Sequence, residues 1–166
     1  MRDEAARIYE RGLERGLTNG RHLTQLLVAS LYAACRERGV PRTLDDVAAA
    51  SGADRKAVAR CYRLLVRELN MSIPVANPAE YVATLASRAK LNAGVQARAL
   101  EVLHRAEEAG VTAGMDPMGL TASALYMAAA LEGQKLTQRS AAEAAGVTEV
   151  TIRNELKRLS PVLEVS

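Results

Sequence analysis

Runs of apolar residues at helical spacing make up most of the chain, and glycines or helix-capping residues separate them. The two longest apolar runs cover residues 23–38 and 117–132, and a glycine, Gly39 or Gly133, follows each directly. Glycine destabilises a helix interior but is favoured just beyond a helix C-terminus. The pattern therefore predicts two long apolar helices, each ended by a glycine, among several shorter helices.

The chain contains an internal repeat at an offset of 94 positions, which superposes residues 16–58 on residues 110–152 without a gap. The matched pairs include Gly16/Gly110, Gly20/Gly114, Gly39/Gly133, Gly52/Gly146, Tyr32/Tyr126 and Thr43/Thr137, and Leu65/Leu159 match at the same offset beyond this range. Because glycine is costly inside helices and marks where each one stops, chance does not explain this agreement. The sequence therefore predicts two copies of one helical unit.

Two prolines separate the copies. The stretch "NMSIPVANPAEY" holds Pro74 and Pro78, so the helix that ends near Asn70 cannot run through it. We predict a first repeat at residues 1–70, a linker at residues 71–78 and a second repeat at residues 79–166.

The second copy is predicted to open with a helix over residues 79–91. At the repeat offset, the equivalent helix of the first copy falls before Met1. We therefore predict that the first repeat lacks its opening helix in this chain, and we expect the chain to be a fragment of a longer protein.

The composition favours helix-on-helix packing. The chain has no Phe or Trp and five Tyr, while 49% of its residues are hydrophobic and 25% are charged. A core of Ala, Leu, Val and Ile suits closely packed helices, so we predict an all-α fold. No run approaches the roughly 18–20 apolar residues that span a bilayer, and charged residues follow Met1, which predicts a soluble, cytoplasmic protein.

The sequence carries no signature of catalysis or of metal binding. Cys35 and Cys61 lie in helical patterns without a CxxC arrangement, which predicts buried, inert thiols and no metal site. No nucleophile lies beside a base at catalytic spacing, and no Gly-rich phosphate loop opens a helix after a strand. We therefore predict that the chain is not an enzyme and binds no cofactor.

The charge is unevenly distributed between the two copies. Residues 1–70 carry 13 Lys and Arg against 9 Asp and Glu, whereas residues 71–166 carry 9 against 10. An electrostatic footprint for phosphate is therefore expected mainly in the first copy.

The stretch "AAGVTEVTIRNELKRL" has the pattern of a helix-turn-helix. Residues 140–145 form a short helix, Gly146 supplies the turn, and residues 148–159 form a second, amphipathic helix. Ile152, Leu156 and Leu159 are predicted to be buried, which places Val150, Arg153, Asn154 and Lys157 on the opposite face. Such a face can read the major groove of DNA, but the last helix of an ordinary bundle has the same pattern.

Two motifs resemble a known family. The stretches "GVPRTLDDVAAASGADRKAVARCYRLLVREL" and "LEGQKLTQRSAAEAAGVTEVTIRNELKRL" closely resemble the core domain of archaeal transcription factor B and its eukaryotic relative TFIIB. The resemblance implies two cyclin-like repeats of five helices that bind the TATA-binding protein on bent promoter DNA. It also implies a helix before "EAARIY", and a zinc ribbon and a polymerase-contacting linker in the full-length protein, outside this sequence.

The resemblance assigns roles to individual residues. It implies that Val150 and Arg153 contact the bases of the recognition element upstream of the TATA box. The residues that it implies on the nearby DNA backbone are Gln138, Arg139, Thr148, Thr151 and Lys157. In the first copy it implies a loop near DNA downstream of the TATA box, at Gly20 and Arg21, and a basic partner-binding face, at Arg55, Lys56, Arg60 and Arg63.

The sequence departs from the family pattern at two places. Glu155 and Leu156 stand where relatives often have a basic residue and an aromatic one, and Met115 stands where the second copy is often basic. Both departures predict weaker affinity for phosphate on that side.

We interpret the chain as the core of a general transcription initiation factor. It is expected to act as a monomer, bind the TATA-binding protein and double-stranded promoter DNA, help to recruit RNA polymerase, and lie on the nucleoid of a prokaryotic cell. The alternatives are a protein-binding cyclin-box scaffold without DNA contact and a generic helix-turn-helix repressor, which usually needs a dimer to read two half-sites.

Overall fold

The computed structural model describes residues 1–18 and 23–164, and helices are the only regular secondary structure in these residues. The chain divides into two compact units, Met1–Ala76 and Asn77–Ser166, and the division falls inside the stretch predicted to be a linker. Within the described residues, no helix is long and apolar enough to cross a membrane. The fold is all-α, as the sequence predicts.

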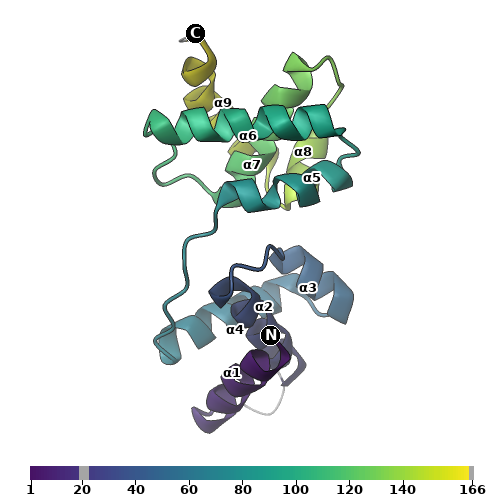
Figure 1. The fold of residues 1–166 in the computed structure, drawn as a ribbon. Helices are drawn as coiled ribbons and strands as arrows, with labels where there is room; N and C mark the ends of the chain where they lie inside the picture. Colours follow the sequence, from purple (N-terminus) through teal and green to yellow (C-terminus); the bar gives the residue numbers. More distant parts are fainter. Residues whose placement is uncertain (19–22, 165–166) are drawn as a thin grey trace. The chain divides into compact units, whose positions relative to one another are not determined.

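The first unit is built around α2 (Figure 1). Its helices are α1 (Arg2–Glu14), α2 (Leu23–Glu37), α3 (Leu44–Ser51) and α4 (Arg55–Glu68). α2 packs against the other three helices. The largest fully buried side chains of this unit are Ile8, Leu26, Val58 and Leu65. The predicted core of aliphatic residues and alanines therefore forms.

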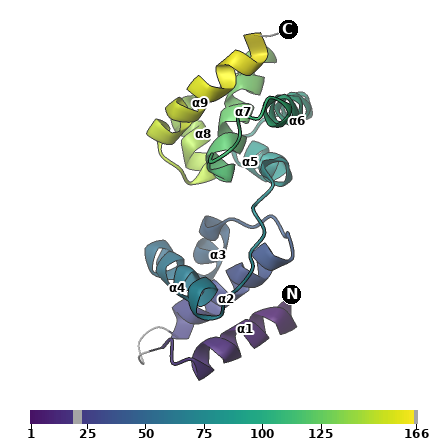
Figure 2. The ribbon, with the colours of Figure 1, turned by 90° about the vertical axis from the view of Figure 1, so that its left-hand side faces the viewer.

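The second unit surrounds α7 (Figure 2). Its elements are a 3-10 turn η1 (Pro78–Tyr81) and the helices α5 (Val82–Arg88), α6 (Ala93–Glu108), α7 (Pro117–Leu131), α8 (Gln138–Ala145) and α9 (Glu149–Glu164). α7 contacts all of the other elements of the unit. It is apolar on nearly every side, which is typical of a helix at the centre of a bundle.

The two units use the same residues to begin and end equivalent helices. Thr43 caps α3 by accepting a hydrogen bond from the Asp46 N–H, and Thr137 caps α8 by accepting one from the Ser140 N–H. Gly52, with φ of 64°, ends α3, and Gly146, with φ of 66°, ends α8. A residue with a Cβ is strained at such positive φ angles, so glycine is favoured at both helix ends.

Two predicted helix boundaries are wrong. Residues 79–91 do not form one helix, because Asn77 caps the short turn η1 and α5 then ends at Arg88. α9 does not end at Leu159 but continues to Glu164 through Pro161. Proline removes one N–H from the helical ladder, and the buried side chain of Val162 holds the last turn in place.

Within the described residues, the first unit has no counterpart of η1 and α5. Leu27 and Leu31 of α2 are 51% and 39% exposed, whereas Thr121 and Leu125, which lie 94 positions later in α7, are fully buried. Thr121 Oγ1 donates a hydrogen bond to the Pro78 carbonyl at 2.9 Å, so the opening segment covers α7 directly. The described residues of the first unit therefore leave this face of α2 without the cover that α7 has.

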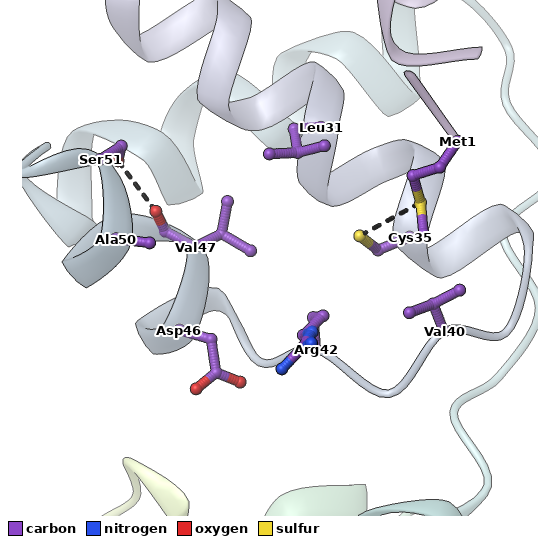
Figure 3. A pocket seen from close by; sticks show the side chains of 9 residues that line it. All are labelled: Met1, Leu31, Cys35, Val40, Arg42, Asp46, Val47, Ala50 and Ser51. Atoms are coloured by element: carbon purple, nitrogen blue, oxygen red, sulfur yellow. Dashed lines mark hydrogen bonds between the residues drawn. The ribbon is translucent and has the colours of Figure 1, made fainter. Parts of the chain in front are cut away.

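A pocket of about 450 Å³ lies where the first unit lacks this cover (Figure 3). Leu31 and Cys35 of α2 and Val47 of α3 give it apolar walls. Its other lining residues are Met1, Val40, Arg42, Asp46, Ala50 and Ser51. In the second unit, Arg88 of α5 reaches the equivalent place and donates a hydrogen bond to the Ala144 carbonyl at 2.9 Å.

We expect α2 to open more often than α7, because α2 exposes apolar side chains at positions that are buried in α7. Ala34 and Ala128 are equivalent and fully buried, so their amide hydrogens are a matched pair. The amide of Ala34 should exchange at least about tenfold faster after correction for intrinsic rates. Equal protection of the two amides by NMR hydrogen exchange would contradict this expectation.

Candidate nucleic-acid interface

α8 and α9 form the predicted helix-turn-helix. α8 ends at Gly146, and Thr148 begins α9 by accepting a hydrogen bond from the Thr151 N–H at 3.2 Å. The hydroxyl groups of Thr148 and Thr151 also lie 3.0 Å apart. Two of the residues proposed to contact the DNA backbone therefore already stabilise the first turn of α9.

The outer face of α9 presents an apolar residue and basic residues to solvent. Val150 is 57% exposed, and Arg153, Asn154 and Lys157 are exposed. Arg153 Nη2 lies 3.8 Å from Glu149 Oε2, a long and solvent-screened ion pair that a DNA base can replace at small cost. The outward orientation predicted for these four residues is confirmed, whereas their contact with bases stays a prediction.

Two further candidate residues lie at the start of α8, the helix before α9. Gln138 is partly buried, and Arg139 is exposed. Arg139 Nε donates a hydrogen bond to Glu143 Oε1 at 3.0 Å, and this bond raises the pKa of the guanidinium. If Arg139 binds a phosphate, it must therefore give up its solvent-exposed ion pair with Glu143.

The buried face of α9 differs from the prediction. Ile152 and Leu159 are fully buried as predicted, but Leu156 is only partly buried and Glu155 is buried in its place. The buried stripe continues to Val162, and this direction brings position 155 rather than 156 towards the unit's interior. The sequence pattern favours burial of the apolar Leu156, because a carboxylate is rarely buried.

Glu155 lies against the N-terminus of α7. Its Oε1 accepts a hydrogen bond from the Asp116 N–H at 3.2 Å, while Oε2 is buried and has no hydrogen-bond partner among the described residues. Burial, and after it the nearby Asp116 carboxylate, raise the pKa of Glu155, which comes to about 7. The Asp116 N–H and the Arg158 guanidinium act in the opposite direction.

Arg158 was not predicted to have a role. Its Nη2 donates hydrogen bonds to the carbonyl oxygens of Val111 at 2.8 Å and Ala113 at 2.7 Å. These carbonyls belong to the connection between α6 and α7. The repeat gives no hint of this contact, because the equivalent residue in the first copy is Leu64.

The first copy presents a basic face on α4. Arg55, Lys56, Arg60 and Arg63 are all exposed, and Arg55 Nε donates a hydrogen bond to Asp45 Oδ1. In the part of the chain that the structure describes, no ion pair joins the other three to an acidic residue. The last candidates, Gly20 and Arg21, lie outside the described residues.

The cysteines and acidic residues do not form a metal centre in the described ranges. Cys35 is buried and Cys61 is partly buried, both are free thiols, and burial raises the pKa of each. No group of three potential ligands there is placed to hold a metal ion. The zinc ribbon that the resemblance implies lies outside this sequence and stays a prediction.

The fold and this surface define a protein of tandem cyclin-like helical repeats. The family model of the transcription factor TFIIB repeat matches residues 1–68 and 71–161. The chain belongs to this family, which consists of transcription factors and not of enzymes.

Curated relatives named transcription initiation factor IIB match almost the whole chain. The protein of Saccharolobus shibatae is 46% identical over 166 residues, which are 100% of this chain and 54% of that protein. The protein of Pyrodictium occultum is 48% identical over 163 residues, 98% of this chain and 53% of that protein. The protein of Methanocaldococcus jannaschii is 47% identical over 165 residues, 99% of this chain and 24% of that protein. The chain thus spans about half the length of the first two relatives, and these names support a role in transcription initiation.

Proposed function

We propose that this chain is the part of a general transcription initiation factor that binds the TATA-binding protein on bent promoter DNA. In this proposal α9 reads the element upstream of the TATA box, and the bound factor helps to recruit RNA polymerase. The protein acts as a monomer on the nucleoid, in the cytoplasm of an archaeal cell.

The observation that carries this proposal is the outer face of α9. Val150 and Arg153 lie one turn apart near the start of the helix and point to solvent. An arginine can donate two hydrogen bonds to guanine in the major groove, and valine can contact the methyl group of thymine. Lys157 lies a further turn along and suits a phosphate.

The α4 face supports a second contact of another kind. Lys56, Arg60 and Arg63 offer positive charge without an apolar residue comparable to Val150. Such a face favours an acidic protein surface or phosphates over base recognition. We propose that it binds the TATA-binding protein.

A gel shift tests the central proposal. The chain alone should bind TATA DNA weakly, because its net charge is only +3, and should bind much more tightly with the TATA-binding protein, which supplies the bent DNA. Equal affinity with and without that protein would contradict the proposal. Binding to the TATA-binding protein without any contact to DNA would instead support a cyclin-box scaffold.

Two substitutions on α9 separate base recognition from phosphate contact. Arg153→Ala should weaken binding to a promoter with the preferred upstream element by about 1–3 kcal/mol and leave a scrambled element nearly unaffected. Lys157→Ala should weaken both about equally, because a phosphate contact is independent of sequence. Both are measured in the ternary complex with the TATA-binding protein. The same loss on both DNAs for Arg153→Ala would exclude base reading by this helix.

A further inference from the structure

We propose that Glu155 and Arg158 are positioning residues that fix the rotation and register of α9, and with them the way its outer face is presented. The effect on DNA recognition rests on the proposed function, whereas the anchoring is a property of the chain itself. Neither side chain lies on the face predicted to read DNA.

The two residues attach α9 to one short backbone segment. Glu155 accepts the hydrogen bond of the Asp116 N–H, and Arg158 donates to the Val111 and Ala113 carbonyls. The remaining contacts of α9 are largely apolar, and apolar contacts are non-directional. The hydrogen bonds of these two side chains, nearly one turn apart on α9, therefore supply the directional part of the attachment.

The absence of a side chain at Gly119 lets α9 approach α7 closely at Glu155. A Cβ at Gly119 would lie 2.6 and 2.8 Å from the two carboxylate oxygens of Glu155 and 2.8 Å from Thr151 Cγ2. Thr151 lies one turn before Glu155 and shares the first turn of α9 with Val150. A displacement of Glu155 is therefore transmitted directly to the start of the outer face.

The first copy lacks this attachment. The residues equivalent to Glu155 and Arg158 are Cys61 and Leu64, and the one equivalent to Gly119 is Gln25. These three line a pocket of about 170 Å³ together with Leu17, Ala57 and Arg60. The place that the second unit fills with a polar anchor is thus partly empty in the first, so the anchor does not follow from the repeat architecture.

The anchor is sensitive to protonation. The charged groups that act on the Glu155 carboxyl are Asp116 at the N-terminus of α7 and Arg158 on α9, and no charged group of α6 or α8 is among them. The pKa of about 7 means that this carboxyl is protonated below neutral pH and ionised above it. Ionisation places a negative charge beside Asp116 and leaves Oε2 charged without a hydrogen bond. The pose of α9 should therefore change as the pH rises through about 7.

An NMR titration of the free chain tests the anchoring. In the unchanged chain, the backbone amide signals of Val150 and Arg153 should shift with a midpoint near pH 7. Glu155→Gln should abolish this step, because glutamine keeps the acceptor but does not titrate. Arg158→Ala should move the same signals at every pH, whereas Arg7→Ala, which removes an exposed charge from α1, should leave them in place. Amide signals that do not respond to pH, or that respond equally in Glu155→Gln, would overturn the proposal.

A binding experiment then tests the effect on recognition. In the complex with the TATA-binding protein, the ratio of affinities for matched and scrambled upstream elements should fall about threefold to tenfold between pH 6 and pH 8. Glu155→Gln should keep the pH 6 ratio at both pH values. A pH-independent ratio in the unchanged chain would overturn the link to recognition. No discrimination at either pH, together with the NMR step, would refute the proposed function and still support the anchoring.

Discussion

The second unit is expected to lose roughly 3 kcal/mol of stability between about pH 4.5 and pH 7 through the Glu155 carboxyl alone. The folded state holds the pKa of Glu155 at about 7, above the ordinary value of 4.5. Between these values the folded chain binds a proton that the unfolded chain has released. The stability that Glu155 contributes is therefore fully present below its pKa in the unfolded chain. It is lost as the pH rises to its pKa in the folded chain.

Urea unfolding at several pH values measures this loss. Glu155→Gln has no proton to release at this position, so it should be about as stable as the unchanged chain near pH 4 and more stable by roughly 3 kcal/mol at pH 8. Other groups that titrate in this range affect both chains and cancel in the difference. If the difference in stability were constant from pH 5 to pH 8, Glu155 would not be the responsible group.

Gly119→Ala is expected to lower the free energy of unfolding of the second unit by about 3 kcal/mol. The added methyl group would overlap both carboxylate oxygens of Glu155 and the Thr151 methyl group, with distances of 2.6 to 2.8 Å. α9 must then move away from α7, or the carboxyl must leave its place. Each response gives up buried contacts.

Gly94→Ala is the matched control. Gly94 is also helical, but the nearest atoms to an added Cβ are Asn92 Oδ1 at 3.3 Å, which caps α6 and would have to shift only slightly, and Glu132 Oε2 at 3.5 Å, an ordinary contact distance. Alanine favours the helix, so this variant should be as stable as the unchanged chain or slightly more stable. Adding Glu155→Ala to Gly119→Ala should restore part of the lost stability, because it removes the overlap with the carboxyl group. The recovery should be incomplete, because the overlap with the Thr151 methyl group remains. Equal stability of the Gly119→Ala and Gly94→Ala variants in thermal unfolding would disprove the packing argument.

The sequence predicts best those features that depend on one residue and its near neighbours. Gly52 and Gly146 mark helix ends because only glycine adopts their positive φ angles without strain. Thr43 and Thr137 mark helix starts because their hydroxyl groups accept hydrogen bonds from the backbone N–H groups three residues later. The outer face of α9 is predicted equally well, since helical periodicity alone decides which side is exposed.

The features that depend on distant residues could not be predicted. Glu155 is buried because Asp116 and Gly119, on another helix, provide a hydrogen-bond donor and room for the carboxyl. No local pattern contains this information, and the local pattern favoured Leu156. Arg158 has the same explanation, because its partners lie 47 and 45 residues earlier.

The Thr and Gly caps that α3 and α8 share have a consequence for how such a protein can change. The first and last residues of α3 and α8 are equivalent in the two copies, while the exposed residues of α4 and α9 differ. Exposed substitutions usually alter stability by less than about 0.5 kcal/mol. After a duplication, each copy could therefore acquire its own surface chemistry through a few point mutations, with little risk to folding. Exchanging outer-face residues between the two helices should accordingly leave the stability of each unit nearly unchanged.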